Sequence, residues 1–523
     1  MSPINLRDTA KRLFGDRLAE RGLPAPHLEL ALSPEIGPEG FRLENADGGV
    51  KLTGGDDRGL LYGLGKLLRE PAWRGTSVPR LPVRGIYFAT HFHNWYHDAP
   101  IAEVERYVED LALWGINSLQ VWFDMHHYTG IDDPAAAEMI ERLRAILAAA
   151  QRVGMAAGLC SLANEGYAGG PEALRATWGR GDFRLPAHYH TEICPHEPGG
   201  MDQIVRWAEE RMLAFADLGI EYLWLWPYDQ GGCCCPLCHP WGSNGFLYTA
   251  ERVARRARQV LPGVKIVLCT WDFDAYWPGE WEGLDRAFRA GQDWADLMLA
   301  DGRDGHYAMY PMEHGVPGGL PLVGFPEISM YGCCPWGGFG ANPFPALIQG
   351  LWDQGKARLS GGWPYSEGIF DDLNKVVCAQ LYWDPDRPVA EIVREYAAGE
   401  FSPKVVGEVE EAMALLERTL PRERVIRDGI TRWVLAHPEG AEGAHDLLQA
   451  AEGKLDARAR ESWRWRILSL RARLDAELVR NEGLVSPAAE AALGELTEIY
   501  HAQEGCAWVA PPTREAVRAD RQA

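Results

Sequence analysis

Acidic side chains recur along this chain at points where short apolar stretches end. The clearest case is Asp229, which follows the apolar stretch 222–226 and precedes the pair Gly231-Gly232. Parallel α/β folds place their chemistry where a buried strand meets a glycine-rich loop. The same arrangement is expected at one histidine and six further carboxylates: His91, Asp124, Glu165, Asp272, Asp301, Glu327 and Glu367. Like charges gathered at one rim shift the pKa values of one another, so one carboxyl can stay protonated near neutral pH.

Aromatic side chains accompany these acids at the same predicted strand ends. They are Trp122, Trp226, Trp271, Trp336, Trp363 and Tyr365. A rigid, flat apolar face suits stacking on a sugar ring, although core packing must account for many of the 21 tryptophans. Carboxylates next to flat aromatic side chains predict glycoside hydrolysis. In that reaction one acid protonates the leaving oxygen, and a second carboxylate acts at the anomeric carbon. For any single acid, a helix cap or an ion pair is an equally good interpretation.

A cluster of cysteines follows Asp229 directly. Cys233, Cys235, Cys238 and His239 offer three thiolates and an imidazole, a set that suits zinc. The spacing is tighter than in a usual zinc ribbon, so one ligand could come from Cys333, Cys334 or His196 instead. A buried loop of reduced cysteines and a catalytic metal are the alternatives. We expect no cofactor to be required for the chemistry itself, and structural zinc remains open.

The elements that must position these residues form a repeating pattern. Strands are predicted at residues 84–91, 116–124, 155–164, 221–226, 265–272, 295–301, 322–327 and 359–367, with helical periodicity in most of the intervening segments. Eight strand–helix modules with short linkers predict an α/β fold of the (β/α)8 TIM-barrel type. The stretch after the sixth strand is rich in glycine and proline and shows no helical period. An open doubly wound sheet is the alternative, but Thr90-His91-Phe92-His93 does not resemble its phosphate-binding turn.

Two flanking regions complete the predicted organisation. Residues 1–80 show an amphipathic start, three strands and a helix, which predicts a small N-terminal α/β accessory domain. Residues 81–387 form the predicted barrel. Residues 388–523 are charged and helical in pattern, which predicts a C-terminal helical domain.

The negative net charge of the chain argues against two classes of binding partner. The chain of 523 residues has 74 acidic and 52 basic side chains and a net charge of −22. Nucleic acids and anionic membranes both need a basic surface, so neither is an expected partner. The first residues lack the apolar core of a secretory signal, and six of the eleven cysteines are clustered, so we expect a cytoplasmic protein. The sequence leaves a homo-oligomer open.

Particular segments resemble known families of glycosidases. The three strands, the Gly-Gly-Asp turn and "RGLLYGLGKLL" resemble the accessory domain of family 20 hexosaminidases and family 67 α-glucuronidases. The order of this domain, the barrel opening "PVRGIYF" and a strand-four carboxylate is similar to the same group. The segments "YDQGGCCCPLCH" and "YSEGIFDDLNKVVCAQLYWDPD" are similar to barrel proteins related to family 163 endo-β-N-acetylglucosaminidases. The chain departs from family 20 at strand four, where an Asp-Glu pair is replaced by Asp229-Gln230. Glutamine cannot donate a proton as an acid does, so the family 20 roles do not transfer to that position.

These observations together predict a glycosidase that acts on the end of a small oligosaccharide or glycoside. We expect Asp229 to be the acid and Glu327 the nucleophile or base, with Glu165 in reserve. The hexosaminidase resemblance implies that Glu367 holds sugar hydroxyls, and His91, His93, Asp124, Asp272 and Asp301 are further candidates for hydroxyl binding. The alternatives are a non-catalytic carbohydrate-binding barrel and a metal-dependent sugar isomerase or lyase that uses the cysteine cluster.

Overall fold

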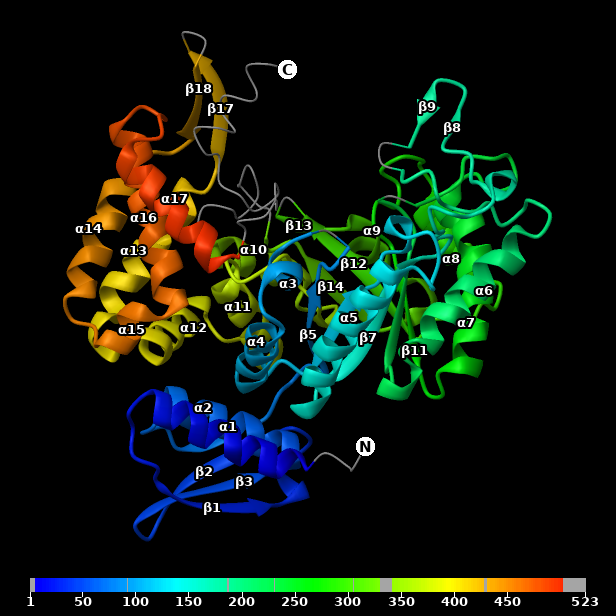
Figure 1. Cartoon of the computed structure of the whole chain (residues 1–523). Coiled ribbons are helices and arrows are strands. Elements are labelled where there is room, and N and C mark those ends of the chain that lie inside the picture. Colours follow the sequence, from blue (N-terminus) through cyan, green and yellow to red (C-terminus); the bar gives the residue numbers. More distant parts are fainter. Residues whose placement is uncertain are drawn as a thin grey trace.

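The computed structural model describes residues 5–91, 93–185, 188–229, 231–303, 305–329, 341–427 and 430–501, without the side chains of 422, 424, 427 and 430–433. Figure 1 shows a central barrel. An N-terminal unit of one sheet and two helices lies below the barrel, and a group of C-terminal helices lies beside it. Within these residues, no helix is long and apolar enough to cross a membrane.

The centre of the molecule is a closed parallel barrel. Its strands are β5 (Val83–Phe88), β6 (Ser118–Trp122), β7 (Ala156–Leu162), β10 (Tyr222–Trp226), β11 (Lys265–Cys269), β12 (Leu297–Arg303), β14 (Leu322–Pro326) and β15 (Leu359–Gly362). Each strand pairs with the next in this order, β15 returns to β5, and all of these pairings are parallel. The predicted (β/α)8 fold is therefore confirmed.

The strands read as continuous apolar runs because both of their faces are covered. All residues of β5, β6, β7, β10 and β14 are buried. Large aromatic side chains, including Trp224 and Trp363, fill the inside of the barrel. Gly85 makes room for one of them, since a Cβ atom there would lie 1.9 Å from the ring of Trp363.

Helices cover the outside of the barrel (Figure 1). They are α4 (Ile101–Leu113), α5 (Pro134–Arg152), α6 (Gly200–Leu213), α7 (Phe246–Val260), α8 (Glu280–Arg289), α10 (Pro345–Gly355) and α11 (Asp372–Trp383). Between β12 and β14 lie only the short strand β13 (His306–Tyr307), the six-residue helix α9 (Met309–His314) and a 3-10 turn, which agrees with the weak helical pattern there. The segment between β7 and α6 contains a small hairpin, β8 (Gly179–Arg180) and β9 (Phe183–Arg184).

The N-terminal unit closes the amino-terminal end of the barrel. It comprises α1 (Leu6–Glu20), β1 (His27–Leu32), β2 (Phe41–Ala46), β3 (Gly49–Gly54), α2 (Asp57–Arg69) and a strand that we did not predict, β4 (Gly75–Ser77), with sheet order β1-β3-β2-β4. The carboxylate of Asp56 accepts a hydrogen bond from the N–H of Gly59 and caps α2, as the sequence predicts. Glu39 binds the buried guanidinium of Arg84 near the start of β5, at the end opposite the carboxylates.

The C-terminal region is mainly helical, with one unexpected hairpin. Its helices are α12 (Val389–Tyr396), α13 (Val406–Thr419), α14 (Ala441–Glu452), α15 (Ala457–Glu461), α16 (Trp463–Arg480) and α17 (Pro487–Ile499). The antiparallel strands β17 (Arg422–Arg427) and β18 (Ile430–Leu435) interrupt them, where only helices were expected.

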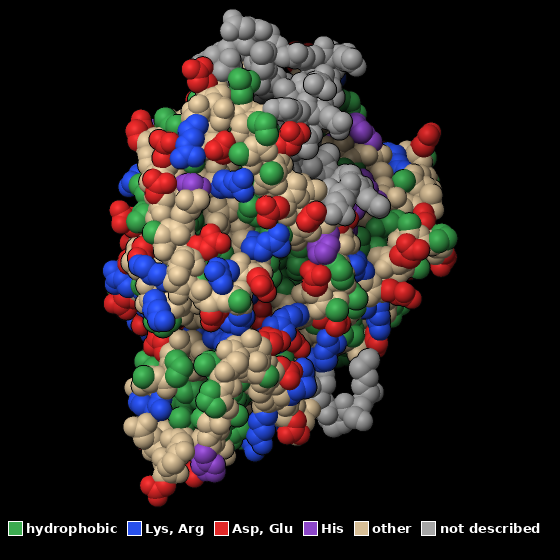
Figure 2. Space-filling model, turned by 60° about the vertical axis from the view of Figure 1, so that its left-hand side comes forward, with side chains coloured by type: hydrophobic (Ala, Val, Ile, Leu, Met, Phe, Trp, Pro, Cys, Tyr) green, Lys and Arg blue, Asp and Glu red, His purple; other side chains and the backbone are tan. Residues whose placement is uncertain are grey.

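Ion pairs join the three regions. Arg464 of α16 reaches Asp110 of α4 and Asp372 of α11, and Glu395 of α12 binds Arg69 of α2. Because these contacts cross both predicted boundaries, the division at residues 80 and 387 stays a prediction. On the face shown in Figure 2, basic side chains are interspersed with acidic ones.

Candidate active site

The seven predicted carboxylates all lie at the carboxyl ends of barrel strands. Asp124, Glu165, Asp229 and Asp272 follow β6, β7, β10 and β11 within three residues, and Asp301 lies within β12. Glu327 directly follows β14, and Glu367 follows β16 (Tyr365–Ser366), a short strand that pairs with β5. These ends meet at one rim of a parallel barrel, where enzymes of this architecture hold their active sites.

The first group at the rim is a buried pair of carboxyls. Asp124 and Glu165 are 3% and 4% exposed, and they lie close enough for the charge of Asp124 to raise the pKa of Glu165. Glu165 also accepts hydrogen bonds from Trp122 Nε1 (3.2 Å) and the N–H of Met125 (2.9 Å), and it forms an ion pair with Arg211 (3.0 Å). Burial raises the pKa of each carboxyl to about 8, while Arg211 opposes the shift at Glu165. The pair therefore retains a proton at neutral pH.

Replacing Arg211 with methionine should destabilise the protein by about 3–5 kcal/mol, because Glu165 would be left buried without its counter-charge. Without the arginine, the folded-state pKa of Glu165 rises further above its unfolded value. The penalty should therefore be smaller at pH 5, where Glu165 is protonated, and larger at pH 9. Urea unfolding at both pH values measures this. Arg206→Met, in the exposed part of the same helix, is the control and should change little. Equal losses in the two variants would contradict the assigned ion pair.

Aromatic rings from two other segments lie near the Asp124–Glu165 pair. The ring of Tyr189, from the segment after β7, stacks on His126 with centroids 3.3 Å apart. His91 stacks on Trp122 at 4.7 Å, and burial lowers its pKa to about 3. His91 is therefore neutral at physiological pH and suits hydroxyl binding better than proton donation.

His93 and Asp98 lie outside this group. The ring of His93 is about half exposed, and its Nε2 is hydrogen-bonded to Asp98 Oδ1 at 2.7 Å. Its predicted role in substrate binding therefore gains no support from its position.

The second group surrounds Asp229. Arg303 of β12 forms ion pairs with Asp272 and with Asp301 (3.2 Å to the latter), and its guanidinium lies 4.1 Å from the ring of Trp271. Burial and the charge of Asp272 raise the pKa of Asp229 to about 7, and Arg303 opposes the shift. Burial also raises the pKa of Asp301. Among the aspartates of this group, Asp229 is thus the one that can lose and regain its proton near neutral pH.

Two of these aspartates have unusual backbone geometry. The φ angles of Asp229 and Asp272 are +72° and +59°, in the left-handed region that most side chains avoid. Such conformations cost roughly 1–3 kcal/mol and persist at functional sites where the surrounding structure imposes them. They turn the chain sharply after β10 and β11.

The third group lies at the ends of β14 and β15. Glu327 Oε1 accepts a hydrogen bond from the N–H of Ser329 (2.9 Å), and the hydroxyl of Ser329 contacts Asp371. The hydroxyl of Tyr365 donates to Glu367 Oε1 at 2.6 Å. Burial raises the pKa of Glu367 to about 7, although the bond from Tyr365 opposes the shift. Two acids from neighbouring strands therefore lie on the side of the rim away from β10.

The tryptophans fall into different environments. Trp226 packs against Trp271 (5.4 Å between centroids) and Phe325 (5.1 Å) below the rim. Within the described residues, the indole N–H groups of Trp226 and Trp271 are buried without a hydrogen-bond partner. They are thus available to a hydroxyl group of a bound molecule.

Trp363 lies elsewhere. Its ring is fully buried inside the barrel, and its Nε1 donates to Ser118 Oγ at 2.7 Å, so it offers no face to a sugar ring. Gly361, with a φ of +110°, and the register shift between β14 and β15 place it there. Trp336, Cys333 and Cys334 lie outside the described residues.

The structure brings three of the predicted metal ligands together with one that we did not predict. Cys194, Cys233, Cys235 and Cys238 have sulfur atoms within 4.8 Å of one another. Cys194 comes from the segment after β7, 39 residues before Cys233 in sequence, and no local spacing indicated it. His239 is not part of this group, and its ring contacts Trp277 edge-on at 4.1 Å.

Another group of donors lies at the rim itself. Asp124, His126 and His127 also lie within 4.8 Å of one another. Asp124 is already engaged by His126 and by Glu165.

Comparisons with known proteins support the fold. No protein-family model and no curated protein matches the chain. A family 89 glycoside hydrolase from Clostridium perfringens matches with a TM-score of 0.64 and 13% identity over 94% of this chain and 64% of that one, so the chain spans about two thirds of its length. A family 115 4-O-methyl-α-glucuronidase with specificity for decorated arabinogalactans matches with a TM-score of 0.61 and 13% identity over 97% and 76%.

A third solved structure is the family 20 exo-β-N-acetylglucosaminidase from Vibrio harveyi. It matches with a TM-score of 0.52 and 13% identity over 78% of this chain and 73% of that one. At this identity, the likenesses establish a shared architecture.

Proposed function

We propose that this chain is a glycoside hydrolase that acts on the end of a small oligosaccharide or glycoside, with Asp229 as the acid and Glu327 as the nucleophile or base. The observation that carries the proposal is the pKa of Asp229, which burial and Asp272 raise to about 7 at the rim of the barrel. An acid that protonates a leaving group works best when its pKa lies near the operating pH. The solved structures with the same architecture are described as glycoside hydrolases, which supports this reaction class.

The positions of the two carboxylates suit attack from two sides of a sugar. Asp229 follows β10 and Glu327 follows β14, and β11 and β12 separate these strands in the barrel. Asp229 would donate its proton to the glycosidic oxygen as the bond to the anomeric carbon breaks. Glu327, held by the N–H of Ser329, would attack that carbon or deprotonate the attacking water.

Neighbouring groups would bind the sugar. The free indole N–H groups of Trp226 and Trp271 can donate to hydroxyls, and neutral His91 and Glu367 can accept or donate hydrogen bonds. Tyr189, stacked on His126, would cover one side of a bound sugar. A site covered on one side favours the end of a small substrate over the middle of a long polymer.

A panel of nitrophenyl glycosides, assayed with and without a chelator, tests the proposal. Release of nitrophenol from at least one sugar, unaffected by the chelator, is the expected result. Sugar binding without hydrolysis of any substrate, measured by calorimetry, would indicate a carbohydrate-binding barrel instead. Activity that disappears with the chelator while Tm and circular dichroism stay unchanged would point to a metal-dependent enzyme, because removal of a purely structural ion would also lower Tm.

Replacing Glu367 with glutamine should weaken substrate binding at least as much as turnover. The carboxyl accepts the hydroxyl of Tyr365 and lies beside the rim, so the amide would change the hydrogen bonds offered to a sugar while preserving shape. We expect KM to rise about tenfold, the effect of losing about 1.4 kcal/mol of binding, with a similar or smaller fall in kcat. Steady-state kinetics measure both. An unchanged KM with kcat reduced about a thousandfold would instead make Glu367 a chemical participant.

We also propose a cytoplasmic location, with a small carbohydrate as the expected partner. The eight described cysteines are all free thiols, a state typical of a reducing compartment.

A further inference from the structure

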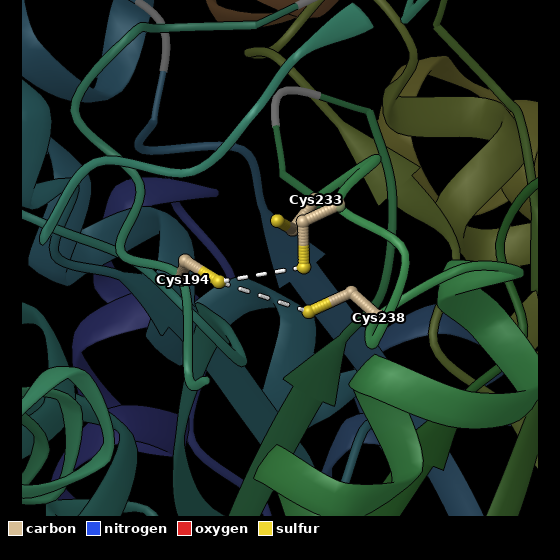
Figure 3. A group of neighbouring side chains, drawn as sticks. Cys194, Cys233 and Cys238 are labelled. Atoms are coloured by element: carbon tan, nitrogen blue, oxygen red, sulfur yellow. Dashed lines mark hydrogen bonds between the residues drawn. The ribbon is translucent and has the colours of Figure 1, made fainter. Parts of the chain in front are cut away.

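Four cysteine sulfur atoms from two separate segments meet beside the loop after β10. Figure 3 shows Cys194 facing Cys233 and Cys238 across the gap between these segments. The Sγ atom of Cys194 lies 3.7 Å from that of Cys235 and 4.0 Å from that of Cys238. In a tetrahedral zinc site, Zn–S bonds of about 2.3 Å place the sulfur atoms about 3.8 Å apart. These two separations match edges of a ZnS4 tetrahedron, and all four sulfur atoms lie within 4.8 Å of one another.

We propose that Cys194, Cys233, Cys235 and Cys238 bind one structural Zn²⁺ ion. Cys194, Cys233 and Cys238 are at most 2% exposed, and Cys235 is partly exposed. The proposal rests on the sulfur geometry and does not depend on the proposed hydrolase activity.

The backbone around the sulfurs is arranged as a zinc-binding turn would require. The N–H of Cys238 donates to the carbonyl of Cys235 at 3.1 Å, which closes a tight turn between these two ligands. The N–H of His239 donates to the same carbonyl at 3.0 Å.

The role of such an ion would be structural. Four protein ligands complete a tetrahedron, whereas a catalytic zinc keeps one position open. The two segments that it would join are also linked by Asn164, whose side chain donates to the carbonyls of Ile193 (3.1 Å) and Gly232 (3.0 Å).

The proposed ion lies close in sequence to two parts of the rim. Cys194 is five residues after Tyr189, and Cys233 is four residues after Asp229. The ion would therefore fix the segment that carries Tyr189 against the loop that carries Asp229.

Metal analysis of the full-length protein, purified without chelator, tests the proposal directly. We expect about one equivalent of zinc in the wild type and less than about a tenth in Cys194→Ala and Cys235→Ala. Cys235 is the most exposed of the four, so this variant is the one expected to fold, which circular dichroism checks. Cys234→Ala is the matched control: Cys234 is buried between two ligands in sequence but is not in the group, so this variant should retain its zinc.

A second measurement separates loss of metal from loss of folding. Removing zinc from the wild type with a chelator should lower Tm and speed proteolytic cleavage within residues 174–200, and adding Zn²⁺ back should reverse both. The proposal is overturned if the reduced wild type neither contains nor takes up zinc, or if it holds iron instead. Retention of zinc by Cys194→Ala would remove Cys194 from the ligand set.

Discussion

Replacing Asp229 with asparagine is expected to slow hydrolysis of substrates with poor leaving groups by about 10²- to 10⁴-fold, the usual contribution of a general acid. Asparagine has the same shape but no proton to give to the glycosidic oxygen. Nitrophenyl glycosides need little protonation, because nitrophenolate is a good leaving group, so their hydrolysis should be largely spared. The ratio of the two rates, measured for the same sugar, isolates the role of the acid from any effect on binding.

The dependence on pH provides an independent check of the same residue. Because the folded-state pKa of Asp229 is raised to about 7, wild-type activity on poor leaving groups should fall as the pH rises above 7. Hydrolysis of nitrophenyl glycosides, which needs little protonation, should lack this alkaline limb in the wild type and in the variant. The raised pKa also means that the contribution of Asp229 to stability is present below its unfolded pKa and is lost as the pH rises through about 7. Hydrolysis of a natural-type substrate by Asp229→Asn at near the wild-type rate would show the strand-four assignment to be wrong.

Replacing Glu327 with glutamine should abolish hydrolysis of both substrate classes, with a loss of at least about a thousandfold in kcat. A nucleophile or base is needed whatever the leaving group, and glutamine can neither attack the anomeric carbon nor accept a proton from water. The hydrogen bond from the N–H of Ser329 can be retained by the amide oxygen, so the variant should stay folded. Rates on both nitrophenyl and alkyl glycosides measure the loss.

The control for this variant is Glu313→Gln, which changes an exposed glutamate at the end of α9 and should leave the kinetics unchanged. If Glu327→Gln retains activity on nitrophenyl glycosides, Glu165 becomes the leading candidate. Analysis of the product anomer by NMR then distinguishes a nucleophile, which gives retention, from a base, which gives inversion.

The barrel could be predicted from sequence because each strand is a short, continuous apolar run between helical segments. Stretches such as 222–226 and 322–326 have no exposed face, so their apolar character is unbroken. The hairpin 422–435 could not be predicted in this way, because charged side chains recur along its first strand and resemble the helical segments around it.

The site was only partly predictable for a related reason. Strand ends indicated the carboxylates, but nothing in the sequence indicated which cations would meet them. Arg211 lies within α6 and Arg303 at the end of β12, and only the closed barrel brings them to Glu165 and to Asp272. Cys194 is too distant in sequence from Cys233 for any spacing rule. Trp363 was misplaced because the positive φ of Gly361, within β15, breaks the alternation along the strand.

The left-handed backbone at Asp229 and Asp272 limits which residues evolution can substitute there. Besides glycine, asparagine and aspartate adopt this conformation most readily, whereas a β-branched or bulky side chain would be strained in it. A homologue that has lost its chemistry but kept its fold should therefore carry asparagine or glycine at position 229 more often than alanine or valine. The residue at position 229 in a newly sequenced homologue would then distinguish proteins that still hydrolyse glycosides from proteins that only bind carbohydrate.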